Sequence, residues 1–448
     1  MAEQQHKVGL LTGTSLVVGN MVASGIFMLP ATLASYGSLS LIAWILSGLG
    51  AVCIALIYAW VSRIMPVAQG GPYAYTREGM GEFAGFWVAW GYWISVWCTN
   101  AALAIACVSY LTTFIPVLGT NVIAAVITGL SLIWFLTWLN TTGIRNAGSM
   151  QVITTIAKLV PLCMIAVGGL FYIHLDHFTV FNRSDTSSTQ AIIKATTLTF
   201  FAFLGLECAT IPSSNIKNPE KNIPRATIIG TLLSTIIYIL STVAVMGILS
   251  PESLIQSKAP LADAADHIWG PWARYLIGAG AVISTFGALN GWILMQGQVP
   301  AAAAMDGLLP KIFAKENKHH TPYMSIILSS ILVSGLMIMN YNKSLASAYE
   351  FAILLSTLTV LMPYLFSVIA YVILASRHKK YPLKPVHVTV AILAFVFSVW
   401  AVIGSGAEIV FYGFILLLVG LPLYTIMKMQ TKNKITSTMS IEGNSGLV

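Results

Sequence analysis

The chain has 448 residues, of which 57% are hydrophobic and only 8% are charged. Soluble domains carry about 25% charged residues, so this composition predicts a polytopic membrane protein and leaves little room for a soluble domain. The formal net charge of +8 would suit nucleic acid, but the basic residues are distributed over the loops between apolar segments rather than along one surface.

Apolar segments long enough to cross a bilayer recur along the chain, because a spanning helix needs about 20 apolar residues. We predict an all-α polytopic membrane protein with twelve transmembrane helices. Their expected ranges are 11–36, 40–64, 84–114, 121–140, 148–173, 192–214, 226–249, 271–302, 322–341, 347–375, 386–403 and 407–428. They form a single transmembrane domain over residues 1–430. The polar stretch 431–448 is expected to be a disordered cytoplasmic tail.

The basic residues predict the orientation of these helices. With twelve spans, both termini lie on one side, and most lysines and arginines fall in loops on that side. Only Arg183, Lys258, Arg274 and Lys343 fall in loops on the other side. Positive loops stay in the cytoplasm, so both termini are expected to be cytoplasmic and no nucleic-acid partner is expected.

Two loops have helical patterns of their own. Residues 258–269 predict a short external helix with Pro260 in its first turn, a position that proline favours. Residues 306–315 predict an amphipathic helix on the internal side.

Glycines interrupt the first and sixth apolar segments, at Ser24-Gly25 and Leu204-Gly205. A break at membrane depth frees backbone N–H and C=O groups, which are tolerated only where they line a cavity. Paired breaks in two halves of a chain indicate the substrate site of a secondary transporter. We therefore predict that helices 1 and 6 are discontinuous, although a plain glycine kink or a close helix contact would give the same local pattern.

Two charged residues lie deep in apolar segments. Glu207 follows the second break, and Lys158 lies in the middle of the fifth segment. Intramembrane charges cost several kcal/mol, about 2.5–3.5 on insertion scales, so each is a candidate for function. Glu207 is a candidate for proton exchange, and Lys158 would either pair with it or replace a bound cation. A structural hydrogen bond and a lysine that fills a polar packing gap are the alternatives.

The breaks together suggest a receptor for an α-amino acid. The N–H groups at Ser24-Gly25 begin a half-helix, which suits a carboxylate, and carbonyls near Leu204 suit an ammonium group. Trp292 could stack on a ligand. Asn100 and Ser356 are polar groups in apolar surroundings and are either ligand contacts or links between helices.

Catalytic sites find no support in the sequence. All eight histidines fall in loops or at segment ends, and no Cys/His set has metal-ligand spacing. No phosphate-binding GxxxxGK[ST] motif is present. We therefore predict no enzymatic activity, no cofactor and no metal site.

With these residues in place, the chain resembles the amino acid–polyamine–organocation transporters, and within them the bacterial basic amino acid and polyamine antiporters. The resemblance covers about residues 7–430. The motifs that carry it occur in order: Gly70-Gly71-Pro72-Tyr73-Ala74-Tyr75, Gly205-Leu206-Glu207, Lys217-Asn218-Pro219, Gly291-Trp292 and Asp306-Gly307-Leu308-Leu309-Pro310.

The resemblance implies a fold and a setting. It implies two inverted repeats of five helices, over about 11–173 and 192–375, with helices 11 and 12 over about 386–428. It also implies a location in the bacterial inner membrane. Members of the family often form homodimers. The implied activity is exchange of a basic amino acid for its decarboxylated amine, as arginine for agmatine, or for another amino acid.

The resemblance also assigns roles to single residues. Substrate contacts are implied for Ser24, Gly25, Ser95, Val96, Asn100, Phe201, Leu204, Trp292 and Ser356. Gating or proton coupling is implied for Tyr92, Glu207 and Tyr364, and a tyrosine of the polyamine exchangers matches Tyr424.

Two departures keep a second function open. Phe201 replaces the tryptophan usual in span six, which keeps an aromatic ring but loses the indole donor. Lys158 replaces a small residue and resembles a lysine of proton-coupled neutral amino acid transporters, where it stands in for sodium. A neutral amino acid carrier is therefore the alternative. A channel or an amino acid sensor fits less well, since polar groups form one cluster and no output domain is evident.

Overall fold

The computed structural model describes residues 9–68, 70–142, 147–211, 213, 216–318, 321–340 and 343–430. Within these residues the regular structure is helical, and no strand occurs. The expected tail 431–448 lies outside them.

Sixteen α-helices are present in the described ranges. They are α1 (Leu10–Met21), α2 (Gly25–Ala34), α3 (Leu39–Ile64), α4 (Pro72–Met80), α5 (Glu82–Leu111), α6 (Val122–Thr141), α7 (Ala147–Cys163), α8 (Ser188–Phe200), α9 (Pro219–Ile248), α10 (Pro251–Gln256), α11 (Pro260–Trp269), α12 (Pro271–Met305), α13 (Tyr323–Met339), α14 (Leu345–Arg377), α15 (Pro385–Gly404) and α16 (Ala407–Leu418).

Local sequence explains where many of these helices begin. Proline occupies the first turn of α4, α9, α10, α11, α12 and α15. A backbone N–H at this position would have no acceptor within the helix, so proline, which lacks one, costs no hydrogen bond there. Side chains cap others: Asn121 accepts a hydrogen bond from the Ala124 N–H, and Ser344 accepts one from the Ser347 N–H. Such caps satisfy N–H groups that the helix cannot.

Eleven helices among the described residues are long and apolar enough to cross a membrane. Helix α13 is also apolar but has 17 residues, and at 1.5 Å per residue it covers about 26 Å of a hydrocarbon core about 30 Å thick. The chain is thus an all-helical, multi-pass membrane protein. Twelve spans and an inverted repeat remain predictions.

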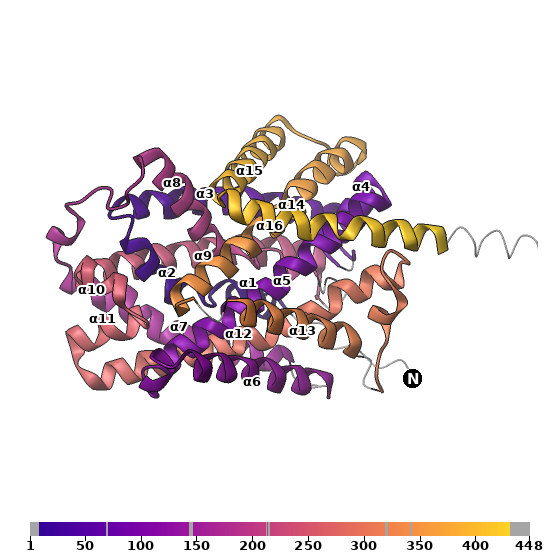
Figure 1. Ribbon diagram of the computed structural model, residues 1–448. Helices are drawn as coiled ribbons and strands as arrows, with labels where there is room; N and C mark the ends of the chain where they lie inside the picture. Colours follow the sequence, from indigo (N-terminus) through magenta and orange to yellow (C-terminus); the bar gives the residue numbers. More distant parts are fainter. Residues whose placement is uncertain are drawn as a thin grey trace, which may run out of the picture.

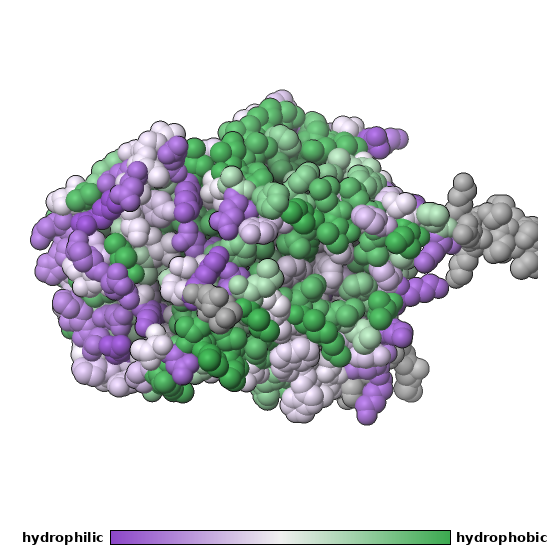
Figure 2. Space-filling model, in the orientation of Figure 1, coloured by the Kyte–Doolittle hydropathy of each residue, from purple (hydrophilic) through white to green (hydrophobic). Residues whose placement is uncertain are grey.

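The helices pack around α5, which is buried along nearly its whole length. In contrast, α6, α15 and α16 lie at the perimeter and expose many large apolar side chains. Helices α10 and α11 lie at one end of the bundle. Helix α4 and the C-terminal end of the span Ala407–Gln430, which begins with α16, lie at the other end (Figure 1). Hydrophobic residues gather across the middle of the surface, and hydrophilic residues cover the end with α10 and α11 (Figure 2). This division is typical of a bilayer-embedded bundle.

The two helices predicted in loops had different outcomes. Helix α11 confirms a helix in the first loop, with Pro260 at its start, and its external position stays a prediction. The prediction for 306–315 was wrong, since only Lys311–Ala314 forms a single 3-10 turn. Gly307 has a positive φ of 75° and Pro310 follows it, so neither continues an α-helix.

Candidate functional site

The first membrane segment is interrupted between α1 and α2. Val22, Ala23 and Ser24 separate the two helices, and the Ser24 carbonyl accepts hydrogen bonds from the N–H groups of Phe27 and Met28 at 3.2 and 3.0 Å. The N–H groups of Gly25 and Ile26, which precede these two, have no acceptor within the helix. They form a positive helix end that favours an anion.

The sixth segment is interrupted just after α8. A 3-10 turn, Phe201–Phe203, follows α8, then Leu204 is extended and Gly205 has a φ of 103°. A second short turn, Cys208–Thr210, ends the segment. A positive φ of this size is readily adopted only by glycine, so Gly205 is the residue that allows the break.

The two interruptions lie against each other. A methyl group built on Gly25 would lie 2.8 Å from the Ala202 Cβ, and one built on Gly205 would lie 3.1 Å from the Asn20 Cβ. Both distances are shorter than an ordinary contact, so the missing side chains let the two backbones approach. The sequence predicted an interruption in each segment, and the structure shows that the two interruptions are in contact.

We expect Gly25→Ala to lower transport by at least tenfold. The added methyl meets Ala202, which cannot move away without shifting its backbone, and overpacking of this kind costs about 1–3 kcal/mol. Substrate uptake into proteoliposomes and the melting temperature of the purified protein measure the effect.

Gly335→Ala is the matched control, because a methyl built on Gly335 in α13 meets nothing within 4 Å. Its transport should equal that of the unmodified protein. Equal activity of Gly25→Ala would show that the close approach at the breaks is not needed.

The Glu207 carboxylate is fully buried beside the second break. The Tyr92 hydroxyl of α5 donates to its Oε1 at 2.7 Å, and the Tyr364 hydroxyl of α14 donates to its Oε2 at 2.7 Å. The carboxylate therefore links α5, α14 and the interrupted segment.

Lys158 is also buried and lies on α7. Its ammonium donates to the Gly19 carbonyl at 2.6 Å and to the Val22 carbonyl at 3.0 Å. These carbonyls end α1, where a helix lacks partners for its last C=O groups and where its dipole favours a cation. Lys158 therefore binds the first break and forms no ion pair with Glu207.

Polar side chains join α5, α12 and α14 midway along the bundle. The Ser356 hydroxyl lies 3.1 Å from the Ser95 hydroxyl and 2.7 Å from the Thr99 hydroxyl, and it donates to the Ser95 carbonyl at 3.0 Å. The Asn100 amide donates to the Gln296 Oε1 at 2.7 Å. The predicted residues Ser95, Asn100 and Ser356 are therefore engaged with neighbouring helices.

Three buried polar atoms on α5 and α12 have no hydrogen-bond partner among the described residues. They are the Trp97 Nε1, the Asn100 Oδ1 and the Trp292 Nε1. Trp97 and Asn100 lie about one turn apart on α5, and Trp292 lies one turn before Gln296 on α12. Because buried polar groups are nearly always satisfied, these atoms mark a place where a polar ligand would gain hydrogen bonds.

An aromatic pair covers the first break. Phe201 packs edge-on against Tyr349, with ring centroids 6.2 Å apart, and the Tyr349 hydroxyl donates to the Ser24 hydroxyl at 3.2 Å. Ser24 is fully buried behind this pair. The remaining predicted contacts, Val96 and Leu204, are also buried, on α5 and in the second break.

Helix α14 orders these contacts along the bundle axis. Tyr349, Ser356 and Tyr364 follow one another at intervals of two turns, so they share one face of the helix. Tyr349 reaches Ser24, Ser356 lies about 10 Å further along, and Tyr364 reaches Glu207 after about 12 Å more. The site is a column with a break-covering pair at one end and the carboxylate at the other.

Sequence reasoning missed three residues of this column and misplaced one. Tyr349, Gln296 and Thr99 make contacts that nothing in their local sequence indicates. Tyr424 does not reach the column: its ring packs on Phe83 and Phe86 in the first turn of α5, with centroids 5.2 and 4.9 Å apart.

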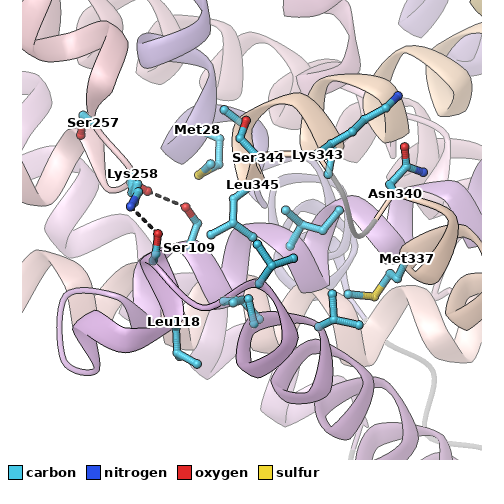
Figure 3. Close-up of a pocket in the computed structure, with 18 of the residues that line it drawn as sticks. Met28, Ser109, Leu118, Ser257, Lys258, Met337, Asn340, Lys343, Ser344 and Leu345 are labelled. Carbon is cyan, nitrogen blue, oxygen red and sulfur yellow. Dashed lines mark hydrogen bonds between the residues drawn. The ribbon is translucent and has the colours of Figure 1, made fainter.

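A separate cavity of about 410 Å³ opens near the end of the bundle that carries α10 (Figure 3). Its lining includes Met28 of α2, Ser109 of α5 and Leu345 of α14. The Ser109 hydroxyl donates to the Lys258 carbonyl at 2.7 Å, and the Lys258 ammonium donates to the Gly119 carbonyl at 2.6 Å. Met28 lies one turn after Ser24, so the cavity adjoins the end of the column at Ser24.

The sequence pattern of the amino acid permease family matches residues 8–428. The chain belongs to the amino acid permease family. This result confirms the family resemblance seen in the sequence and agrees with the interrupted helices of the structure.

Named relatives of this permease are exchangers. It is 35% identical over 334 residues to a cadaverine/lysine antiporter of Escherichia coli, with 74% of each chain covered. It is 31% identical to an arginine/agmatine antiporter of Chlamydia felis, over 96% of this chain and 92% of that one. It is 30% identical to an arginine/ornithine antiporter of Pseudomonas aeruginosa, over 91% and 88%.

Proposed function

We propose that this chain is a secondary active transporter that exchanges a basic amino acid for its decarboxylated amine, or for another amino acid, by alternating access. The observation that carries the proposal is the contact between two interrupted helices, Gly25 against Ala202 and Gly205 against Asn20. Discontinuous helices meeting inside a bundle are how transporters present backbone groups to a substrate. The printed functions of the relatives support exchange.

The two breaks would hold the ends that all α-amino acids share. The N–H groups at Gly25 and the Ser24 hydroxyl would bind the carboxylate, at the positive end of α2. The carbonyl of Leu204 would bind the ammonium group. An amine without a carboxylate would lose the first set of contacts, which allows the protein to release it after exchange.

The middle of the column would receive the substrate's side chain. Asn100 and Ser356, with the backbone at Ser95 and Val96, would accept hydrogen bonds from a cationic head group. The rings of Phe201 and Trp292 would cover its aliphatic part by apolar contact, and an aromatic face would also attract the nearby cationic head group. The unpaired Asn100 Oδ1 supports this role, as it is an acceptor suited to a donor-rich head group.

Gating would use the two ends of the column. Tyr349 and Phe201 would open toward the cavity of Figure 3, and the Tyr92–Glu207–Tyr364 contacts would close the opposite end. We also propose the twelve-helix inverted-repeat arrangement, the single domain over 1–430, cytoplasmic termini, the bacterial inner membrane and a homodimer, on the charge distribution and the family resemblance.

A second candidate function is proton-coupled transport of neutral amino acids. The contacts of Lys158 with the carbonyls of Gly19 and Val22 favour this function, because a fixed ammonium would replace a bound cation as the partner of these carbonyls. A positive charge beside the site would also disfavour a dicationic ligand.

Counterflow in proteoliposomes tests the proposal. Vesicles loaded with arginine, agmatine, lysine, ornithine, putrescine, alanine or leucine are each challenged with radiolabelled arginine, with empty vesicles as the control. We expect the cationic compounds to accelerate uptake and alanine and leucine to have no effect. In a parallel set, the same vesicles are challenged with radiolabelled alanine. Alanine uptake without arginine uptake would instead support the second candidate, and uptake of either label that is independent of any internal compound would contradict exchange and favour a channel.

A further inference from the structure

A second cavity lies away from the column, where the ends of α3, α14 and α15 meet. Its volume is about 310 Å³, and its lining includes Trp60, Arg63, Tyr371, Lys384 and His387. The loop 378–384 contributes to its lining, and this is the side on which most basic residues of the loops are expected. Nothing in the proposed exchange uses these residues.

Aromatic rings form the floor of this cavity. The His387 ring lies against Trp60 at a tilt of 31° with centroids 4.2 Å apart, and the centroids of the Trp60 and Tyr371 rings are 5.7 Å apart. The Tyr371 hydroxyl and the His387 Nδ1 are 2.8 Å apart, so the three rings are held in place. Tryptophan and tyrosine are typical of the level where lipid head groups begin.

Three basic side chains line this cavity. Lys380, which also lines the cavity, is paired with Glu220 at 2.9 Å. Among the residues that the structure describes, Arg63 and Lys384 have no carboxylate within ion-pair distance. Both line the same cavity as the His387 ring. The cavity therefore combines an aromatic floor with two available positive charges.

The helix beyond the cavity faces outward with apolar side chains. Val388, Ile392 and Val396 follow at intervals of one turn along α15 and are 36%, 57% and 58% exposed. This row continues from the charged rim toward the middle of the bundle. An occupant with an anionic head and apolar chains would match both parts.

We propose that this cavity binds the head group of an anionic phospholipid. The phosphate would lie between Arg63 and Lys384, the glycerol part against the rings, and the acyl chains along the exposed row of α15. Basic pockets between membrane helices at a head-group level bind such lipids. The apolar row favours a lipid over a free phosphate compound, which would use only the rim.

Thermal unfolding of the purified full-length protein in detergent tests the site. Phosphatidylglycerol should raise the melting temperature, whereas phosphatidylcholine with the same chains and glycerol phosphate should not. In the Arg63→Gln/Lys384→Gln variant the apparent affinity for phosphatidylglycerol should fall roughly 25-fold, because each basic residue at an anionic surface contributes a factor of about five.

The matched control is Arg377→Gln/Lys379→Gln, which removes the same charge at the start of the same loop from residues outside the cavity lining. It should keep the affinity of the unmodified protein. Equal losses in both variants would mean a diffuse charge effect and would overturn the site. Equal stabilisation by glycerol phosphate would assign the cavity to a soluble anion and would overturn the lipid.

The exposed Lys384→Gln variant covers the case in which the double variant does not fold. Native mass spectrometry of this single variant should show fewer bound phosphatidylglycerol molecules than the unmodified protein. An unchanged number would contradict the proposal.

Discussion

Lys158→Met should lower exchange by at least tenfold while the protein remains folded. Methionine keeps the length and apolar stem of the side chain but removes the ammonium that binds the carbonyls of Gly19 and Val22. An unsatisfied buried carbonyl costs about 1–3 kcal/mol, so the end of α1 must rearrange. Because Ser24 lies two residues after Val22, the rearrangement reaches the proposed carboxylate contact. Counterflow rates and size-exclusion profiles measure the two effects.

The control for Lys158→Met is Lys194→Met, which removes a partly exposed lysine paired with Glu350 at 3.1 Å. Exposed pairs contribute little, about 0–1 kcal/mol, so its transport should be unchanged. In the smaller variant Lys158→Ala, sodium chloride should restore part of the transport and choline chloride should not, if the ammonium acts as a fixed cation. Full activity of Lys158→Met would remove Lys158 from the mechanism.

The breaks could be predicted from the sequence because their cause is local. Gly205 allows a positive φ, and Gly25 allows close approach to Ala202, and both glycines are visible in apolar segments. Glu207 could be singled out for a similar reason, since a carboxylate in such a segment needs a partner. These features depend on residue type and on the surrounding composition alone.

The contacts of the column could not be predicted in the same way. Tyr349 and Ser24 are 325 positions apart, and Asn100 and Gln296 are 196 apart. Nothing in the local sequence distinguishes Tyr349 or Gln296 from a packing residue, because the partner of each residue comes from another helix. The sequence also left open whether Lys158 pairs with Glu207 or replaces a bound cation, and only the packing of α7 against α1 places its ammonium on the carbonyls of Gly19 and Val22.

Glu207→Gln should abolish the pH dependence of exchange. The ionised carboxylate accepts a hydrogen bond on each oxygen, from Tyr92 and from Tyr364, both at 2.7 Å. A protonated carboxyl has one oxygen that donates and is a weaker acceptor, so one of these two contacts is weakened, lost or reversed. The closure at this end of the column is therefore firm when Glu207 is ionised and weaker when it is protonated, and exchange by the unmodified protein should rise as the pH falls.

Glutamine fixes the neutral arrangement at every pH, since its amide offers one acceptor and one donor group in the same place. A hydrogen bond to a charged group contributes about 1.5–3 kcal/mol, which corresponds to a change of about tenfold or more between the two states of the unmodified protein. Counterflow from acidic to neutral pH should therefore rise steeply in the unmodified protein and stay flat in the variant. Glu350→Gln, which removes a partly exposed carboxylate near the other end of α14, should keep the full pH dependence. A Glu207→Gln variant with the same pH profile as the unmodified protein would place proton coupling elsewhere, and the buried ammonium of Lys158 would be the next group to test.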